Sequence, residues 1–233
     1  MVESTDFHRA IRSFVRREGR LTAAQQRAID ELWPCYGVLA DGPPLDLDGL
    51  FGRSAPRVLE IGFGMGDALA EMAARYPEND YLGIEVHRPG VGRLLQRLAD
   101  QGSDNVRVFV ADATRVLQDR IIDGSLDAVL VFFPDPWPKK RHHKRRLIQP
   151  EFVQLLAGKL KPGGRLHLAT DWQDYADHMM TVLSGIDLFE NVCGPGCYSP
   201  RPDYRPMTKF ERRGQQLGHE IRDLVFERRR ERI

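Results

Sequence analysis

The sequence has few cysteines and no apolar run long enough to cross a membrane. Its three cysteines are an odd number, and Cys193 and Cys197 have no second ligand pair at zinc-finger spacing. We therefore expect reduced thiols and no bound metal. A membrane span needs about 20 apolar residues, and the opening MVESTDFHRA lacks the apolar core of a signal peptide. These absences predict a cytoplasmic protein without membrane attachment.

The chain also has almost no net charge, because 34 lysines and arginines nearly cancel 33 aspartates and glutamates. Any binding to nucleic acid must therefore come from local clusters of positive charge. The arginines scattered through the first 20 residues form either a solvated face or an arm that contacts phosphates. At 233 residues, the chain is long enough for one large domain with an additional N-terminal segment.

From Arg57 onward, short strand-like segments alternate with segments of helical periodicity. This alternation predicts a doubly wound α/β fold, in which helices cover both faces of a parallel sheet. Ligands of such sheets bind at the carboxyl ends of the strands, so the residues after each strand are the candidates for a site. We expect strands at 57–61, 81–84, 106–110, 126–133, 165–169 and 219–226, helices at 21–33, 150–160 and 208–217, and a turn at 161–164.

Three glycines at alternate positions follow the first strand, in the segment Glu60-Ile61-Gly62-Phe63-Gly64-Met65-Gly66. Glycines let the backbone turn tightly and approach a ligand before a helix, which we expect to open at Met65. The GxGxG spacing is one residue short of the dinucleotide motif, and no Lys-Ser/Thr pair follows as in a P-loop. A plain tight turn is the alternative. With an acid nearby and few phosphate-binding groups, the segment favours a cationic ligand such as S-adenosylmethionine.

Acidic residues follow the second and third strands. Glu85 lies where a carboxylate accepts hydrogen bonds from both hydroxyls of a ribose, although a surface acid is the alternative. Asp112 is placed either to accept from an adenine amino group or to cap the next helix. Taken with Gly62, Gly64 and Gly66, the two acids predict an adenosine-type ligand lying across three consecutive strand ends.

The fourth strand is followed by Pro134-Asp135-Pro136-Trp137-Pro138. Three prolines restrict the backbone, so Asp135 and Trp137 have little entropy left to lose on binding. An ionised aspartate only accepts hydrogen bonds, which matches the N1–H and N2–H₂ donors of guanine. Trp137 is a candidate to stack on that base. The alternative is a rigid loop with a capping aspartate and a buried tryptophan.

A dense cationic cluster comes directly after this loop. A charge run is often a solvated face, but the position of this one beside the loop favours contact with phosphates, with an affinity that falls as salt rises. Asp171, after the fifth strand, either faces the same cleft or caps the next helix. The cluster consists of Lys139, Lys140, Arg141, His142, His143, Lys144, Arg145 and Arg146.

Several segments together resemble the bacterial tRNA (guanine-N7-)-methyltransferases. The resemblance implies a Rossmann-like class I S-adenosylmethionine-dependent methyltransferase with a mostly parallel sheet and an antiparallel last strand. It also implies a basic N-terminal arm and helix in residues 1–50 and a methyltransferase domain in residues 51–233. The similar segments are LEIGFGMGDAL at 59–69, GIEVHRPGVGRLL at 83–95, FFPDPWPKKRHHKRRL at 132–147, TDW at 170–172 and RPMTKFERRGQQLGHEIRDLVFER at 205–228.

The family transfers the methyl of S-adenosylmethionine to N7 of guanosine 46 in the tRNA variable loop and leaves S-adenosylhomocysteine. The resemblance therefore implies a tRNA partner, with the enzyme a monomer or a homodimer. It implies that Glu60, Glu85 and Asp112 bind the cofactor, and that Asp135 is the active-site acid and also touches the cofactor. The implied substrate contacts are Lys139, Asp171, Thr208, Lys209, Phe210 and Glu211, with Lys140, Arg141, His142, His143, Lys144, Arg145 and Arg146 against the RNA.

This reaction needs no general base, because guanine N7 carries an unshared electron pair and no proton. We therefore expect Asp135 to orient the guanine and not to abstract a proton. The residues themselves leave two other functions open. Another nucleic-acid N-methyltransferase would use a similar loop at an amino group, and a non-catalytic RNA-binding module would hold an adenosine ligand without turnover. A dehydrogenase fits less well, since the glycine spacing is wrong and a catalytic His or Tyr-Lys arrangement is missing.

Overall fold

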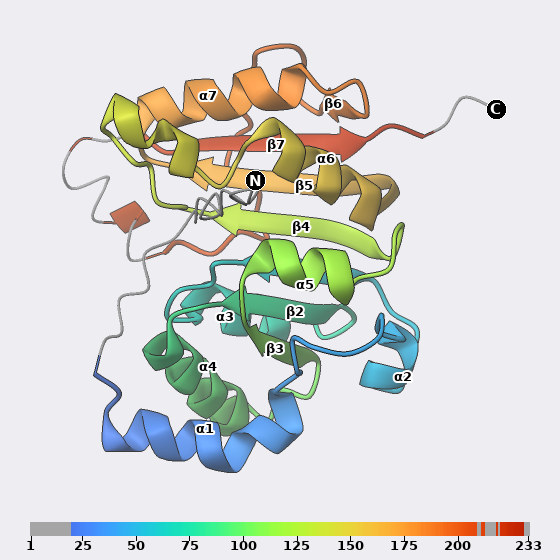
Figure 1. Ribbon diagram of the computed structural model, residues 1–233, viewed down its shortest axis with the longest axis vertical. Coiled ribbons are helices and arrows are strands. Elements are labelled where there is room, and N and C mark those ends of the chain that lie inside the picture. The colour runs from blue at the N-terminus through green and yellow to red at the C-terminus, as the bar shows by residue number, and fades with distance from the viewer. Residues whose placement is uncertain (1–19, 209–210, 213–217, 219, 231–233) are drawn as a thin grey trace, which may run out of the picture.

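The computed structural model describes residues 20–208, 211–212, 218 and 220–230. This part of the chain forms a seven-stranded sheet with the order β3-β2-β1-β4-β5-β7-β6, which runs from bottom to top in Figure 1. The five strands from β3 to β5 are parallel, whereas β7 is antiparallel to both of its neighbours. The strands are β1 (Arg57–Ile61), β2 (Asp80–Glu85), β3 (Val106–Val110), β4 (Leu126–Phe132), β5 (Leu160–Thr170), β6 (Phe189–Asn191) and β7 (Arg222–Arg228).

Helices cover both faces of the sheet, and each face has its own apolar core. The cluster on one face includes buried side chains of α5, α6 and α7. The other includes those of α3 and α4, with side chains of α1 packed against it. The predicted doubly wound α/β class, with its antiparallel last strand, is confirmed. The helices are α1 (Ala23–Tyr36), α2 (Leu47–Phe51), α3 (Asp67–Arg75), α4 (Arg88–Gln101), α5 (Ala113–Asp119), α6 (Pro150–Lys159) and α7 (Gln173–Ser184), with a 3₁₀ helix η1 (Lys140–Arg145).

The bounds of some elements differ from the predicted ones. β1 and β3 have the expected bounds, but the predicted turn at 161–164 lies inside β5. Leu126 pairs with Leu160 and Ala128 pairs with Arg165, so four residues of β5 bulge out opposite one residue of β4. Glycine makes such a bulge accessible, since Gly163 has a φ of +84°. The proline and glycines therefore interrupt the ladder without ending the strand.

The chain between residues 20 and 50 is packed into the fold. Thr22 caps α1, because its hydroxyl accepts a hydrogen bond from the Gln25 backbone N–H at 3.2 Å and the Gln25 side chain accepts one from the Thr22 N–H at 3.0 Å. Val38 and Leu47 belong to the apolar cluster that includes side chains of α5, α6 and α7. The basic arm expected within residues 1–50 falls largely on residues 1–19, outside the described residues. A division of the chain near residue 50 stays a prediction.

The carboxyl ends of the parallel strands converge on one edge of the sheet. The chain leaving β1 is fixed by a hydrogen bond from the Gly62 N–H to the Ile84 carbonyl at 2.8 Å, and the chain leaving β4 by one from the Phe133 N–H to the Ala169 carbonyl at 2.7 Å. The loops that follow β1, β2, β3 and β4 thus start from one edge, as expected for a ligand site in this class. No helix in the described part of the chain is long and apolar enough to span a membrane.

Candidate active site

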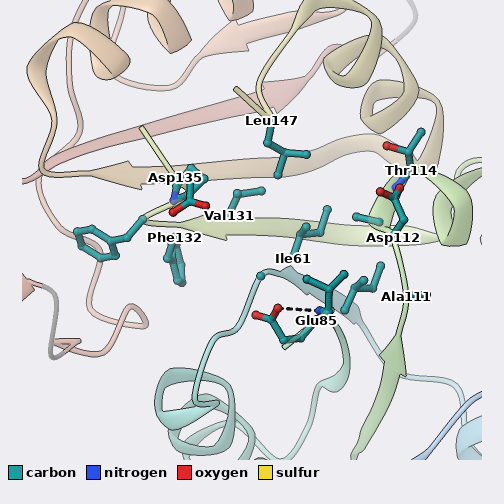
Figure 2. A pocket seen from close by; sticks show the side chains of 15 residues that line it. Ile61, Glu85, Ala111, Asp112, Thr114, Val131, Phe132, Asp135 and Leu147 are labelled. Atoms are coloured by element: carbon teal, nitrogen blue, oxygen red, sulfur yellow. Dashed lines mark hydrogen bonds between the residues drawn. The ribbon is translucent and has the colours of Figure 1, made fainter. Parts of the chain in front are cut away.

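A cavity of about 210 Å³ lies at the carboxyl ends of β1, β2, β3 and β4. It brings together four of the residues predicted from the sequence: Gly62, Asp112 and Asp135, which follow β1, β3 and β4, and Glu85, the last residue of β2. Figure 2 shows Asp135 and Phe132 on one side of this cavity, Glu85 on a second and Asp112 with Thr114 on a third. Apolar side chains form most of the remaining wall: Ile61, Ile84, Val86, Ala111, Ala113, Val131, Phe133, Pro134 and Leu147.

The glycine loop after β1 depends on glycines of its own and on one glycine of α4, for different reasons. Gly62, Gly64 and Gly66 all have a left-handed backbone, with φ of +75°, +59° and +76°. A Cβ atom on Gly62 or Gly64 would meet nothing within 4 Å, so these two residues face open space. A Cβ on Gly90 of α4, by contrast, would lie 1.9 Å from the Gly64 carbonyl oxygen. The sequence predicts the loop but not this close approach by α4, which begins at Arg88, three residues after Glu85.

Glu85 holds the glycine loop against the end of β2. Its Oε2 accepts a hydrogen bond from the Gly64 N–H at 2.8 Å, and its Oε1 accepts from the N–H groups of Val86 and His87 at 2.7 and 2.9 Å. These backbone donors fix the orientation of the carboxylate. Each carboxylate oxygen accepts about two hydrogen bonds, so Oε2 retains capacity for a ligand hydroxyl.

Asp112 caps the next helix, which is one of the two roles that the sequence left as alternatives. Its Oδ1 accepts hydrogen bonds from the N–H groups of Thr114 and Arg115 at 2.9 and 3.3 Å, which makes it the N-cap of α5. Asp112 also lines the cavity. Capping therefore orients the side chain without removing it from the site.

Glu60 is the acid with the most unusual environment near the site. It is 2% exposed, and burial, with a smaller contribution from the negative charge of Glu85, raises its pKa to about 8. Its Oε2 is buried without a hydrogen-bond partner among the described residues. Glu60 precedes Ile61, which lines the cavity, but does not line it itself. A protonated, incompletely satisfied carboxyl therefore lies next to the glycine loop.

Asp135 lies at the mouth of the cavity, on a loop with an unusual backbone. Its neighbours Phe133 and Trp137 have φ of +52° and +46°, and non-glycine residues in this region cost on the order of 1 kcal/mol or more each. The surrounding contacts must therefore determine the loop conformation. One of them is the hydrogen bond from the Arg146 Nε to the Pro136 carbonyl at 3.0 Å.

Arg146 differs from the rest of the cationic cluster. Only 2% of the residue is exposed, and its guanidinium pairs with Asp174, at the start of α7, and stacks over the Tyr175 ring at 4.8 Å. The pair lowers the pKa of Asp174, chiefly through the hydrogen bond from Arg146. We had placed Arg146 among the residues against RNA. In the structure its charge lies inside the fold, where it holds the Asp135 loop to α7.

Two other residues of the cluster contact Trp137, and the remaining lysines and arginines face solvent. The Arg145 guanidinium lies 5.1 Å from the centre of the Trp137 ring, and His142 contacts that ring edge-on at 5.8 Å. One face of the indole, which we predicted to stack on guanine, thus holds a cation. Lys139, Lys140, Arg141, Lys144 and Arg145 are exposed.

The geometry agrees with comparisons to known proteins. Residues 54–224 match the model of a family described as putative methyltransferases. A tRNA (guanine-N(7)-)-methyltransferase of Alkalilimnicola ehrlichii is 62% identical over 95% of this chain and 94% of its own length. One of Hydrogenovibrio crunogenus is 58% identical over 94% of this chain and 92% of its own length. The chain belongs to the tRNA (guanine-N(7)-)-methyltransferase family. The predicted family is confirmed.

Solved structures support the fold at much lower identity. The 16S rRNA methyltransferase KamB has 15% sequence identity and a TM-score of 0.59, over 81% of this chain and 96% of that one. A 16S rRNA (adenine(1408)-N(1))-methyltransferase of Catenulisporales acidiphilia has 15% identity and a TM-score of 0.55, over 83% and 94% of the two chains. At this identity the likeness concerns the fold alone. It places the sheet of this family member in the class I methyltransferase architecture.

The residues predicted to bind substrate are more dispersed than those predicted for the cofactor. Lys139 and Asp171 follow β4 and β5 but do not line the cavity. Thr208 lines a separate hollow of about 220 Å³ beside the start of α3. Glu211 is 2% exposed and bound to Arg205, while Lys209 and Phe210 lie outside the described residues. Among the described residues, no group of His, Cys, Asp or Glu is arranged to hold a metal ion.

Proposed function

We propose that this chain transfers the methyl group of S-adenosylmethionine to N7 of guanosine 46 in the variable loop of tRNA. One observation carries the proposal most: Gly62, Glu85, Asp112 and Asp135, from four successive strand ends, meet around one cavity. Family membership supports the same reaction. When bound, the cofactor supplies an electrophilic methyl on a sulfonium and leaves as S-adenosylhomocysteine.

The residues around the cavity fit this cofactor in chemical type. The open space over Gly62 and Gly64 gives a ligand close access to the backbone. Oε2 of Glu85 would accept from a ribose hydroxyl, and Asp112, which lines the same cavity, from an adenine amino group. Glu60 does not line the cavity but directly precedes Ile61 and the glycine loop, so its unpartnered oxygen would be the acceptor for an ammonium group that reaches this loop.

Asp135 binds and orients the guanine and does not take up a proton during the reaction. The exposed carboxylate of Asp135 would accept hydrogen bonds from N1–H and N2–H₂ of the base and so fix the orientation of the guanine ring at the cavity. Since N7 has no proton to lose, alignment of the reacting atoms is most of the catalytic task. Such alignment contributes on the order of 7–11 kcal/mol in ideal cases. A loop stiffened by three prolines and held by Arg146 suits that role.

The exposed part of the cationic cluster, Lys139–Arg145, provides the contact with tRNA. Its exposed lysines and arginines adjoin the Asp135 loop, so phosphates bound there would bring a base to the cavity mouth. This arrangement explains why a nucleotide within RNA, and not free guanosine, would be the substrate.

The test is to incubate the protein with labelled S-adenosylmethionine and total tRNA and to identify and map the modified nucleoside. We expect 7-methylguanosine at position 46. A different methylated nucleoside would favour another nucleic-acid N-methyltransferase. Cofactor binding without any labelled RNA would favour a non-catalytic binding module.

A further inference from the structure

A fully buried arginine, Arg205, lies beside the residues that lead into the Asp135 loop. Arg205 belongs to the irregular segment before β7, and none of its side chain is exposed. Its two terminal nitrogens donate to the Glu211 carboxylate, Nη1 to Oε2 at 2.6 Å and Nη2 to Oε1 at 3.2 Å. On the other side, Nη2 donates to Oδ2 of Asp223 at 2.9 Å, and Nε lies 2.6 Å from Oδ1 without good hydrogen-bond alignment.

One arm of this network reaches the segment predicted to bind substrate. The backbone N–H of Glu211 donates to the Thr208 hydroxyl at 3.1 Å, so Thr208 caps the helical turn that contains Glu211. Both carboxylate oxygens of Glu211 are engaged by Arg205. The carboxylate is therefore directed into the protein and not toward solvent. It attaches the Thr208 turn to the interior of the protein.

The other arm reaches the end of β4. The Arg205 guanidinium lies 5.9 Å from the centres of both the Phe132 and the Phe133 rings. His167, wholly buried, packs edge-on against Phe132 at 5.0 Å, and its Nε2 contacts Asp223 at 2.7 Å. Phe132 and Phe133, which lead into Pro134 and Asp135, are thus contacted by Arg205 directly. Phe132 is also contacted by His167, which Asp223 holds in place.

The hydrogen bonds of His167 fix its tautomer. Because Asp223 is a carboxylate acceptor, Nε2 of His167 carries the proton, and Nδ1 accepts from the Tyr204 hydroxyl at 2.8 Å. Burial lowers the pKa of His167, so the ring is neutral. The assembly therefore holds one fully buried cation, Arg205, between two carboxylates, with a neutral ring and a hydroxyl beside them. The half-exposed Arg201 lies 3.9 Å from the Glu211 carboxylate as well.

We propose that Arg205 is a positioning residue: paired with Glu211 and Asp223 and lying against the Phe132 and Phe133 rings, it fixes the segment that leads into Asp135, and with it the guanine contact. This inference rests on the function proposed above. A buried ion pair contributes little net stability compared with apolar packing, but its forked geometry restricts orientation. Here the fork binds the carboxylates of Glu211 and Asp223, and the guanidinium so held lies against the Phe132 and Phe133 rings.

The test is Arg205→Lys, which keeps the charge and loses the fork. We expect kcat at saturating tRNA and cofactor to fall at least about tenfold, since displacements of about 1 Å at a reacting centre cost up to about a hundredfold. The Kd for S-adenosylmethionine should change much less than kcat, because the glycine loop, Glu85 and Asp112, at the ends of β1, β2 and β3, do not depend on Arg205, and only the 132–135 wall of the cavity does. Rates are expressed per folded protein, from the unfolding curve of each variant.

Arg57→Lys is the matched control. Arg57 is also 2% exposed and binds two acids, Asp48 and Asp80, but it lies at the amino end of β1, the opposite edge of the sheet. This variant should lose stability and keep kcat. Glu211→Gln should lower kcat as Arg205→Lys does, and the double variant should add nothing further, as for two members of one unit.

The proposal is overturned if Arg205→Lys keeps the wild-type kcat per folded molecule, if Arg57→Lys loses kcat equally, or if Arg205→Lys and Glu211→Gln have independent, additive effects. Failure of the proposed function has a different signature. In that case the wild-type protein itself would produce no 7-methylguanosine in tRNA, before any variant is compared.

Discussion

The two halves of the site are held in place in different ways. On the cofactor side, the carboxylates of Glu85 and Asp112 accept hydrogen bonds from backbone groups, mostly within three residues of themselves. On the substrate side, the Asp135 loop depends on long-range side chains, with Arg146 at Pro136 and Arg205 beneath Phe132. Backbone contacts survive most substitutions, whereas a side-chain anchor is lost with one. The substrate half should therefore be the more easily disturbed.

The largest effect that separates the halves is expected for Asp135→Ala. Turnover should fall by about two to three orders of magnitude, since the variant loses the acceptor that orients guanine at the cavity mouth. Cofactor binding should remain measurable by calorimetry, because the contacts of Glu85 and Asp112 are intact. Asp135→Asn is the companion variant. Full activity in Asp135→Asn would eliminate a role for the negative charge.

Charge reversal of Lys140 and Arg145 should give the next largest effect. Two exposed cations become anions, so tRNA affinity at low salt should fall by about tenfold or more, and the slope of log Kd against log salt should flatten. Filter binding across a salt series measures both quantities. Cofactor affinity serves as the internal control. Unchanged tRNA binding would make Lys139–Arg145 a solvated face.

Arg146→Met tests whether the eighth residue of the charge run belongs with the loop and not with the RNA. The variant preserves apolar packing on Tyr175 but removes the hydrogen bond to the Pro136 carbonyl and the pair with Asp174. We expect kcat to fall by about tenfold, because Asp135 is less firmly placed. The salt slope of tRNA binding should stay unchanged. A flattened slope with normal kcat would return Arg146 to the RNA-contacting group.

The contrast between local backbone contacts and long-range side-chain contacts also explains which features the sequence could predict. The strand ends and their acids follow from local patterns, so the doubly wound sheet and the grouping of Gly62, Glu85 and Asp112 were accessible without a structure. The burial of Arg146 was not, because its partner Asp174 is 28 residues away and the charges around it look alike in sequence. One signal was present: Arg146 borders the apolar Leu147 and Ile148.

The network of Arg205 was likewise beyond local patterns. Its members come from β5, β7 and the segment between 204 and 211, and the His167–Asp223 contact joins residues 56 apart. We had assigned Glu211 to the substrate from the family resemblance, and its attachment to Arg205 depends on tertiary packing that no periodicity encodes. The prolines on either side of Arg205, Pro202 and Pro206, indicated only an irregular chain.

The smallest expected effect concerns Glu60, the buried acid of the cofactor half. Its pKa is near 8 in the folded protein against an ordinary value of 4.5, so the folded state binds more protons than the unfolded state between these values. The stability that Glu60 contributes is fully present below pH 4.5 and is lost as the pH rises through 8. In Glu60→Gln, the decline of stability across this window should become shallower in thermal unfolding at a series of pH values.

Cofactor binding should convert the protonated carboxyl of Glu60 into its ionised form. An ammonium group beside the carboxyl favours its ionised form, so binding of S-adenosylmethionine at pH 7 should release close to one proton. Calorimetry in buffers of different ionisation enthalpy measures this release, and Glu60→Gln should abolish it with only a severalfold loss of affinity. Equal proton release by Glu60→Gln would show that another group titrates. The cofactor half would then be held by backbone contacts alone, without a buried acid that changes state.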